Sequence, residues 1–577
     1  MKIIKTIESE LDNYLNKDID LSDGVKFSQA KLVKRISLFQ NQIYKTGKKD
    51  SQGNYKYYYD IISPRVNSEI KNIDFDTKDV LIWSEMGLID KLAVIISNLF
   101  LKKWLTDNNK GEEINDSIEG FSSWGNVVWK KVKGGYNDVD LKNFFVLNQT
   151  AKTLDDSDVI ERHLMTQSDL RAKKGVWENV DEVIKTCGNK FFSATKTSQE
   201  IETTNNFYEI YERNGEICEK DLFEAQGEEG GSEDNFVLAK IITAGLKKGG
   251  GIDNKYILFA EKISEKPYKE AHRGRYEGRW FRKGLYEILF DCQTRANEIG
   301  NQIARGLEWA SKTFFRSSDT LIIQNALTDM RSGDIVKAKE LAQVETRMQG
   351  FDQLLSDWNR NIEVANVLAN SYEVVTGESL PSNTPFRLGA MMNQNANKLF
   401  DFLREKLSLA FEGLFNDWIL PEMMKDIKSK KVLELSGDDE LLKQYREVVA
   451  RAWYVKNLLI MPPHSIEQGK EFINFKVGEM EENKEERIGV EKGFWDSFKP
   501  RAKVVISGDN VNLSSELETL STFIQLETDP VRRAFLLDLA YAKKNINIPP
   551  PVNTELNQTK PTRELKPKED KLMSLSQ

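Results

Sequence analysis

The stretch RGRYEGRWFRKGLYEILFDCQTRANEIGNQIARGLEWASK, from Arg273 to Lys312, marks a change from a β-rich to a helical part of the chain. It begins with a basic cluster interleaved with aromatic residues: Arg273, Arg275, Arg279, Arg282 and Lys283. Apolar or small residues then recur at spacings of four and three: Leu285, Leu289, Cys292, Ala296, Ile299, Ile303 and Ala310. This alternation is typical of a helix with a heptad-like seam. We therefore predict a long helix over 283–312 that follows a basic segment.

The composition describes a soluble globular protein. The 577 residues are 40% apolar and 30% charged, enough for two to four domains at roughly 150 residues each. We expect no membrane span, because no run of about 18 uncharged apolar residues occurs. We also expect no secretory signal, because the first apolar patch soon reaches Glu8 and Glu10. The three cysteines are far apart in the sequence, which favours reduced thiols in a cytosolic setting.

Two patterns divide the chain before Arg273. Residues 1–120 have apolar residues at helical spacing, most clearly in the stretch 78–105, which we predict as one amphipathic helix. Residues 121–265 alternate apolar and polar residues between turn signals and are predicted to be β-rich. Asn214-Gly215 predicts the tip of a hairpin, and Gly249–Gly251 a second hairpin turn.

The helical pattern returns after a short irregular stretch. A second helix over 351–377 places Phe351, Leu355, Trp358 and Ile362 at four–three spacing and is predicted to end at Thr376-Gly377. The segment ESLPSNTPFRLG follows as a loop, because Pro381 and Pro385 cannot donate a backbone hydrogen bond. A third helix is predicted to end before Pro421. The proline-rich, charged end of the chain is predicted to be disordered.

Motifs for catalysis are missing from the sequence. A phosphate-binding GxxxxGK[ST] loop is absent, and His163, His272 and His464 are too far apart in sequence to nominate a metal site or a triad. The acidic residues Asp155, Asp156 and Asp158 could hold a cation, but a solvated turn explains them more simply. We therefore expect no enzyme, no metal and no cofactor. The basic cluster could contact nucleic acid, pair with acids across a subunit boundary, or fold the turn itself.

The order of these parts resembles the portal protein of tailed bacteriophages. The similar stretches are WGNVVWKKV (124–132), VIERHLMTQSDL (159–170), the joint 267–302, and SYEVVTGESLPSNTPFRLGAMMNQNANK (371–398). In the joint, the family's helix start "G…E.L.D.Q...N" is matched by Gly284, Glu287, Leu289, Asp291, Gln293 and Asn297. The resemblance covers roughly 70–425, and no single motif in it is diagnostic. The composition, rich in Lys, Asn and Ile, suggests an AT-rich phage, for which a crAss-like phage would fit.

The resemblance implies an α+β protomer assembled as a ring. Its expected parts are an N-terminal wing (1–282; helical 1–120, β-rich 121–265), a first stem helix (283–312), a clip (313–350), a second stem helix (351–377), a tunnel loop (378–389), a kinked or wing helix (390–420), a crown-like helical region (421–545) and a disordered tail (546–577). The family forms a ring, usually dodecameric, at a capsid vertex. Double-stranded DNA passes through it, and it binds the major capsid protein, the terminase large subunit and then the head–tail adaptor and tail proteins. The expected location is the virion, and the host cytoplasm during assembly.

Three groups of residues become candidates under this interpretation. The tunnel loop and DNA channel would use Ser382, Asn383, Thr384 and Arg387. The wing–stem joint would use Arg273, Arg275, Arg279, Arg282 and Lys283. Stem packing would use Leu289, Ala296, Ile299, Ile303, Trp358 and Ile362. The formal net charge of -8 suits a pore for a sliding duplex, because every phosphate neutralised by the protein adds affinity and hence drag.

Two rival functions stay open at this point. The basic and aromatic stretch could belong to a nucleic-acid-processing enzyme or to an accessory subunit of one. The chain could also be another structural virion protein, such as a capsid or tail-fibre component. The absent metal and phosphate motifs disfavour the first rival, and the helix–excursion–helix–loop order disfavours the second.

Overall fold

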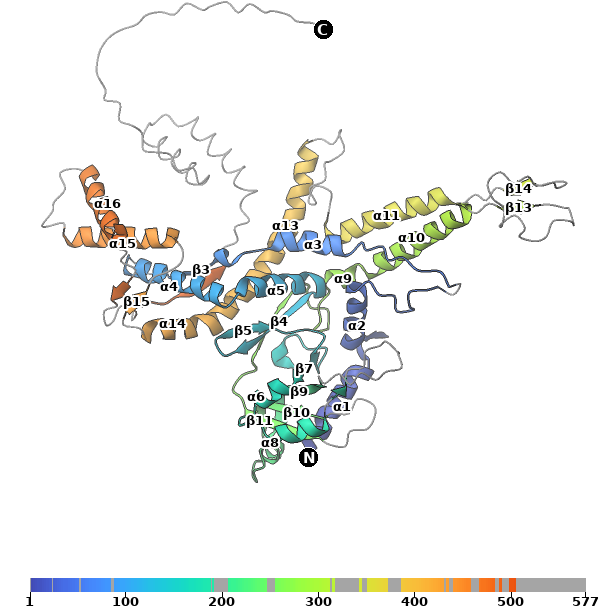
Figure 1. The fold of residues 1–577 in the computed structure, drawn as a ribbon, viewed down its shortest axis with the longest axis horizontal. Helices are drawn as coiled ribbons and strands as arrows, with labels where there is room; N and C mark the ends of the chain where they lie inside the picture. The colour runs from blue at the N-terminus through green and yellow to red at the C-terminus, as the bar shows by residue number, and fades with distance from the viewer. Residues whose placement is uncertain are drawn as a thin grey trace, which may run out of the picture. The chain divides into compact units, whose positions relative to one another are not determined.

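The computed structural model describes most of the first of two units, Met1–Ile506. The described residues are 2–22, 24–50, 53–84, 88–187, 189–190, 206–245, 255–311, 314–316, 342–344, 350–371, 386–429, 432–434, 439–457, 466–482, 487–489, 495 and 498–504. They mix helices with antiparallel sheets, which confirms the predicted α+β class (Figure 1). The predicted tail 546–577 lies outside them. Among the described helices, none is both long and apolar enough to cross a membrane.

The N-terminal part is mostly helical, as predicted, but its described residues also include three short strands. Its elements are α1 (Lys2–Asn16), β1 (Ile19–Ser22), β2 (Val25–Phe27), α2 (Gln29–Gln40), α3 (Ser63–Ile73), η1 (Thr77–Asp79), β3 (Val80–Trp83), α4 (Leu88–Asp107) and α5 (Lys110–Trp124). The prediction of one helix over 78–105 is wrong at its start, because Val80–Trp83 form strand β3 and pair with β17 (Arg501–Val504). The Asn98 side chain of α4 accepts from the Ile82 N–H (2.7 Å) and donates to the Ile82 carbonyl (2.8 Å), which holds β3 extended.

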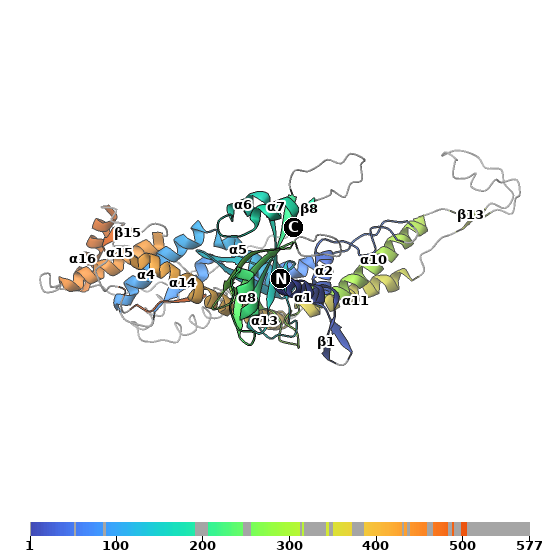
Figure 2. The same cartoon turned by 90° about the horizontal axis from the view of Figure 1, so that it is seen from below.

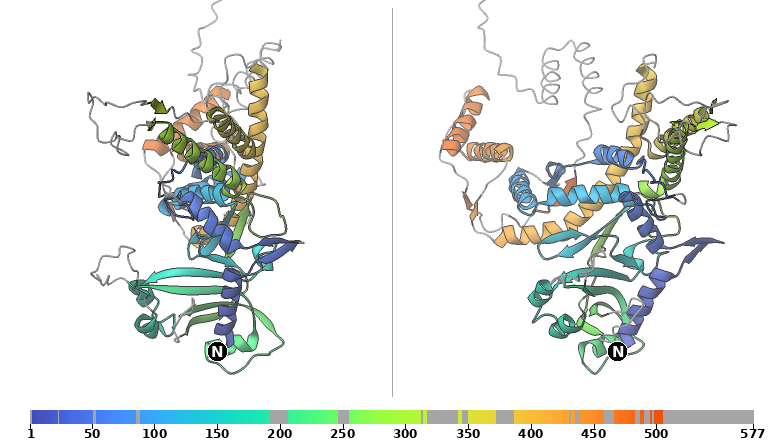
Figure 3. Two further views of the ribbon diagram at one scale, coloured as in Figure 1. Left: turned by 90° about the vertical axis from the view of Figure 1, so that its right-hand side faces the viewer. Right: turned by 45° about the vertical axis from the view of Figure 1, so that its right-hand side comes forward.

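The β-rich part contains a six-stranded antiparallel sheet. Its strands are β6 (Phe144–Val146), β7 (Val159–Thr166), β8 (Asn189–Lys190), β9 (Asn206–Cys218), β10 (Phe236–Ala244) and β11 (Tyr256–Lys262), in the order β11-β10-β9-β7-β6 with β8 beside β9. Successive side chains point to opposite faces. Tyr211 and Ile241 share one core with α1, whereas Ile210 and Ile242 share another with α6 (Gln167–Ala172) and α7 (Val180–Thr186) (Figure 3). The sheet is therefore covered on both faces.

The predicted hairpin tip at Asn214-Gly215 is wrong. Strand β9 runs straight through both residues, and the segment after it forms helix α8 (Glu219–Gln226). Gly215 is needed for close approach, because a Cβ atom there would lie 2.3 Å from Cγ of Asp158 on the neighbouring strand. Asn214 is fully buried and donates hydrogen bonds to Glu212 and Tyr268 (3.1 Å each). The predicted pairing across 249–251 is confirmed, since β10 and β11 are antiparallel.

A three-stranded sheet lies between the six-stranded sheet and the helices. It consists of β4 (Asn126–Val132), β5 (Gly135–Asp138) and β12 (Tyr268–His272), in the order β12-β4-β5. Trp129 of β4 is fully buried, and its ring lies 4.8 Å from that of Phe411 in the long helix α13 (Phe386–Leu414). This sheet therefore contributes to the core that α4, α5 and α13 share.

The predicted long helix after the basic cluster forms in two pieces, α9 (Leu285–Ile288) and α10 (Phe290–Ser311). The chain returns through α11 (Phe351–Ala369), which lies beside α10 (Figures 1 and 2). Of the predicted clip 313–350, the structure describes β13 (Phe314–Arg316), β14 (Ala342–Val344) and Gly350; β13 and β14 pair antiparallel. The predicted end of the second helix at Thr376-Gly377 is wrong: Asn370 adopts the left-handed conformation (φ 51°) and ends α11 there.

The third helix starts and ends elsewhere than predicted. Helix α13 begins at Phe386, so the last four residues of the predicted loop 378–389 are helical. The helix also does not stop before Pro421, because a π-helical turn (η4, Phe415–Ile419) joins it to α14 (Leu420–Ser429). The wider turn lets the Leu420 N–H donate to Phe415, and Pro421 falls in the first turn of α14, where a missing N–H is tolerated. The described parts of 421–545 add β15 (Val432–Glu434), α15 (Asp439–Lys456), α16 (Ile466–Glu482) and β16 (Arg487–Gly489).

Candidate functional site

The joint between the β-rich part and the helical hairpin is built around two touching glycines. Gly125 ends α5 with φ 80°, and a Cβ atom on it would lie 2.4 Å from the backbone nitrogen of Gly284, which precedes α9. The buried Asn126 side chain accepts from the Arg282 N–H (2.9 Å) and donates to the Arg282 carbonyl (3.1 Å). Backbone contact and one amide therefore fix the direction in which α9 leaves the sheet.

Two ion pairs of the basic cluster are internal to the chain. Arg273 donates to both carboxylate oxygens of Glu69 in α3 (2.7 and 2.8 Å), and Glu69 is fully buried. Arg279 donates to both carboxylate oxygens of Glu287 in α9 (2.8 Å each). The Arg273 pair uses two guanidinium nitrogens and is bidentate, so it fixes orientation as well as charge. The Arg279 pair uses one nitrogen for both oxygens. These two arginines therefore hold α3 and α9 against the basic segment.

The other three cations of the cluster also have partners within the chain. Arg282 is buried, donates to the carbonyl of Lys152 (3.0 Å) and lies over the Tyr276 ring. Burial lowers the pKa of Arg282. Arg275 and Lys283 both pair with Glu277 (3.6 and 2.7 Å), and the Arg275 side chain is 88% exposed. The five predicted joint residues therefore do lie together, and contact with phosphate at Arg273 or Arg279 would have to break an internal ion pair.

Three amide side chains on α10 bind the backbone of a distant segment, a role that was not predicted from the sequence. Gln293, Asn297 and Asn301 accept hydrogen bonds from the backbone N–H groups of Ile61 (2.9 Å), Tyr59 (2.8 Å) and Tyr57 (2.8 Å), respectively. These N–H groups belong to residues 41–62, which join α2 to α3 and which we call the strap (Figure 1). Four residues of helix rise about 6.0 Å, and two residues of extended chain about 6.7 Å. The two spacings are similar, so every second residue from Tyr57 to Ile61 meets one amide.

The predicted stem-packing residues lie mostly inside the chain. Leu289, Ala296 and Ile299 are fully buried, and Trp358 and Ile362 pack against the core that contains α9 and α10. Ile303 is half-buried. The seam therefore packs within the chain: Leu289 and Ala296 share one buried core with Ala365 and Ala369 of α11.

Other apolar residues of α11 are exposed. Val364, Val367 and Leu368 have exposed fractions of 44%, 57% and 43%. Residues three and four apart are neighbours on a helix, so these three form one patch.

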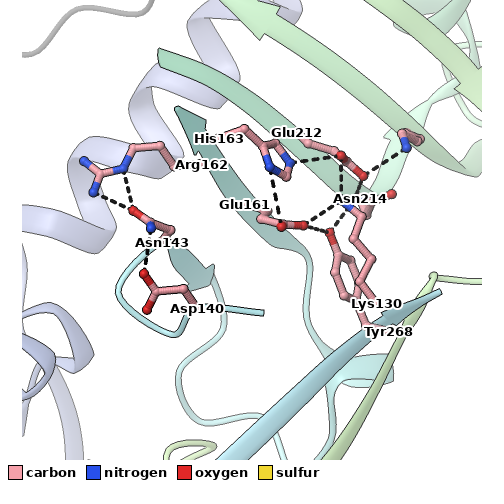
Figure 4. A network of polar contacts seen from close by, with 10 residues as sticks. Lys130, Asp140, Asn143, Glu161, Arg162, His163, Glu212, Asn214 and Tyr268 are labelled. Atoms are coloured by element: carbon pink, nitrogen blue, oxygen red, sulfur yellow. Dashed lines mark hydrogen bonds and ion pairs between the residues drawn. The ribbon is translucent and has the colours of Figure 1, made fainter. Parts of the chain in front are cut away.

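The two sheets are joined by a buried polar network (Figure 4). Lys130 of β4 donates to Glu161 of β7 and to Glu212 of β9, at 2.7 Å each. Tyr268 of β12 donates to Glu161 at 2.8 Å. Burial alone would lower the pKa of Lys130, but the two carboxylates outweigh it and the pKa is raised. The network therefore fastens the three-stranded sheet to the six-stranded sheet.

His163 completes a group that resembles a metal site. Its ring nitrogens lie 3.2 Å from Glu212 and 3.6 Å from Glu161, and the three side chains could together hold an ion. However, Lys130 lies between the carboxylates, and Lys240 is 3.1 Å from Glu212. Two ammonium groups already balance two carboxylates, so a divalent cation would meet uncompensated repulsion. We interpret the group as a structural ion-pair network.

The predicted acidic turn at 155–158 is also structural. Asp156 accepts from Thr153, and Asp158 pairs with Arg213 at 2.7 Å. Lys266 donates to the carbonyls of residues 154, 155 and 157 (3.0, 2.9 and 2.8 Å). These contacts satisfy the turn from within the chain.

The predicted tunnel-loop residues Ser382, Asn383 and Thr384 lie outside the described residues. The backbone of Arg387 lies in the first turn of α13, and its side chain is outside the description.

No protein-family model matches the sequence, and no curated protein matches it significantly.

Proposed function

We propose that this chain is the subunit of a phage portal ring, the vertex pore through which double-stranded DNA is packaged and ejected. The observation that carries the proposal is the α10–α11 hairpin. Its base is fixed rigidly to the β-rich part, its far end leads into the paired strands β13 and β14, and its α11 side exposes an apolar patch. An exposed apolar patch on a helix is favourable where a neighbouring subunit covers it.

The charges of the chain support a pore through which DNA slides, as opposed to a surface that binds DNA tightly. The chain carries a formal net charge of -8, and Arg273 and Arg279 of the basic cluster are neutralised by internal carboxylates. A duplex that slides must make few lasting phosphate contacts. We propose that the ring, of the dodecameric type found in the family, binds the capsid protein, the terminase and then the head–tail adaptor, and that the protein acts without catalysis.

Electron microscopy of the purified full-length protein tests this proposal. We expect rings with a central hole in negative stain, and a mass many times that of the 66.3 kDa chain by mass photometry. A chain that stays monomeric at micromolar concentration would contradict the proposal.

Substitution of the exposed patch tests which surface assembles the ring. Val364→Asp with Val367→Asp should give folded monomers, because both side chains are at least 44% exposed in the single chain. Val176→Asp is the matched control, since Val176 is 68% exposed in the β-rich part. Substitution of Ile299 would be less informative: Ile299 is fully buried, so its replacement would damage the fold itself. Intact rings from the double variant would mean that α11 does not face a neighbour.

A further inference from the structure

The strap exposes a second apolar surface beside the same hairpin. Ile43, Tyr55 and Tyr57 have exposed fractions of 51%, 66% and 61%. Tyr55 and Tyr57 are two residues apart in extended chain, so they share one side. The backbone between them is tied to α10 through Asn301, which binds both the N–H and the carbonyl of Tyr57. The aromatic rings are therefore presented on an anchored segment.

The charges of the strap and of α11 are opposite. The strap carries four lysines, Lys45, Lys48, Lys49 and Lys56, against two aspartates. Asp60 caps α3 and Asp50 pairs with Arg305 (2.9 Å), so the lysines dominate the outward charge. Helix α11 carries three carboxylates, Asp352, Asp357 and Glu363, against one arginine. Asp357 pairs with Arg295 of α10 (2.5 Å), so Asp352 and Glu363 are the carboxylates left for an outside partner.

The charged and apolar residues of α11 lie on the same side. Asp352, Arg360, Glu363 and Val367 follow one another at intervals of eight, three and four residues, which places them on one helical stripe. Val364 lies next to that stripe. Both Asp352 and Glu363 are exposed. This outward face of α11 is thus apolar and acidic, and the strap is apolar and basic.

We propose that the strap of one subunit packs on the outward face of α11 in the next copy of this chain. This inference rests on the proposed ring and names its contact surfaces. A ring requires two different, complementary surfaces on each subunit, joined head to tail. The tyrosines cover Val364 and Val367, and the lysines face Asp352 and Glu363. Nucleic acid is the other anion that lysines and tyrosines could bind, but it would leave the apolar patch of α11 uncovered.

Charge reversal in full-length protein tests the pairing. Lys45→Glu with Lys48→Glu should weaken subunit association by about tenfold, as should Asp352→Lys with Glu363→Lys, because each pair of exposed contacts contributes modestly. The combination of all four changes should restore association. Ring dissociation on dilution, followed by mass photometry, measures these effects. Failure of the combined variant to recover, with both separate variants impaired, would overturn the pairing.

Cross-linking tests the same contact directly. A Tyr57→Cys chain mixed with a Val364→Cys chain, both carrying Cys218→Ser, should cross-link with a short bismaleimide only when rings form. Wild-type rings that neither cross-link nor respond to the reversals would overturn this contact and leave the ring intact. Loss of duplex DNA binding by the lysine variant, with unchanged rings, would assign the strap to nucleic acid. A wild-type protein without rings would overturn the proposed function and this contact together.

Discussion

Removal of one amide from α10 should release the strap locally. Gln293 has no exposed surface; it accepts from the N–H of Ile61, itself only 5% exposed, and donates to the carbonyl of Tyr59. Gln293→Ala removes two hydrogen bonds worth about 1 kcal/mol each and leaves a buried N–H unpaired, which costs about 1–3 kcal/mol unless water enters. We expect the free energy of local opening to fall by about 3 kcal/mol.

Hydrogen exchange of the strap measures this change without requiring global unfolding. Since about 1.4 kcal/mol is a factor of ten, amides of residues 53–62 should exchange on the order of a hundredfold faster in Gln293→Ala. Gln302→Ala is the matched control, because Gln302 lies on the exposed side of the same helix. Unchanged exchange in Gln293→Ala, or an equal increase in Gln302→Ala, would refute the argument that buried amides hold the strap.

Three further substitutions test other parts of the structure. Gly215→Ala should lower the unfolding midpoint, because its Cβ would lie 2.3 Å from a carboxylate, whereas Gly413→Ala, with no atom within 4 Å, should be neutral or slightly stabilising; thermal unfolding of both variants compares them. Glu69→Gln should cost about 3–5 kcal/mol by leaving the Arg273 charge buried, and adding Arg273→Met should recover part of that loss in chemical denaturation. Burial raises the pKa of Asp138 to about 7, so the folded state retains a proton that the unfolded chain releases above pH ~4. Stability should therefore fall as pH rises from ~4 to ~7 and stay lower above; Asp138→Asn should flatten this fall, and a wild-type unfolding midpoint that is equal at pH 5 and pH 8 would contradict it.

The candidate site could be predicted only in outline. The basic cluster 273–283 was correctly placed at the junction with a long helix. The linear sequence shows both features, because the cations directly precede the heptad-like apolar spacing. The partners of the cluster were not predicted: Glu69 lies 204 residues from Arg273, and no local pattern connects them. The amides Gln293, Asn297 and Asn301 had a usable signal, since uncharged polar residues four apart, each beside the apolar seam of α10, indicate a specific partner.

Local periodicity by itself indicated the β-rich segment and the existence of the long helices, though not their ends, because amphipathic spacing reflects which side of each element is buried. Tertiary structure decided everything that depends on a distant neighbour. Asn214-Gly215 is a common hairpin signal. Here, however, the Asp158 side chain lies close against Gly215 and Asn214 donates a hydrogen bond to Tyr268, so strand β9 continues through both residues. Likewise Val80–Trp83 fit a helical pattern, but β17, more than 400 residues later, offers backbone partners. Propensities differ by less than about 1 kcal/mol per residue, and one set of long-range hydrogen bonds is enough to override them.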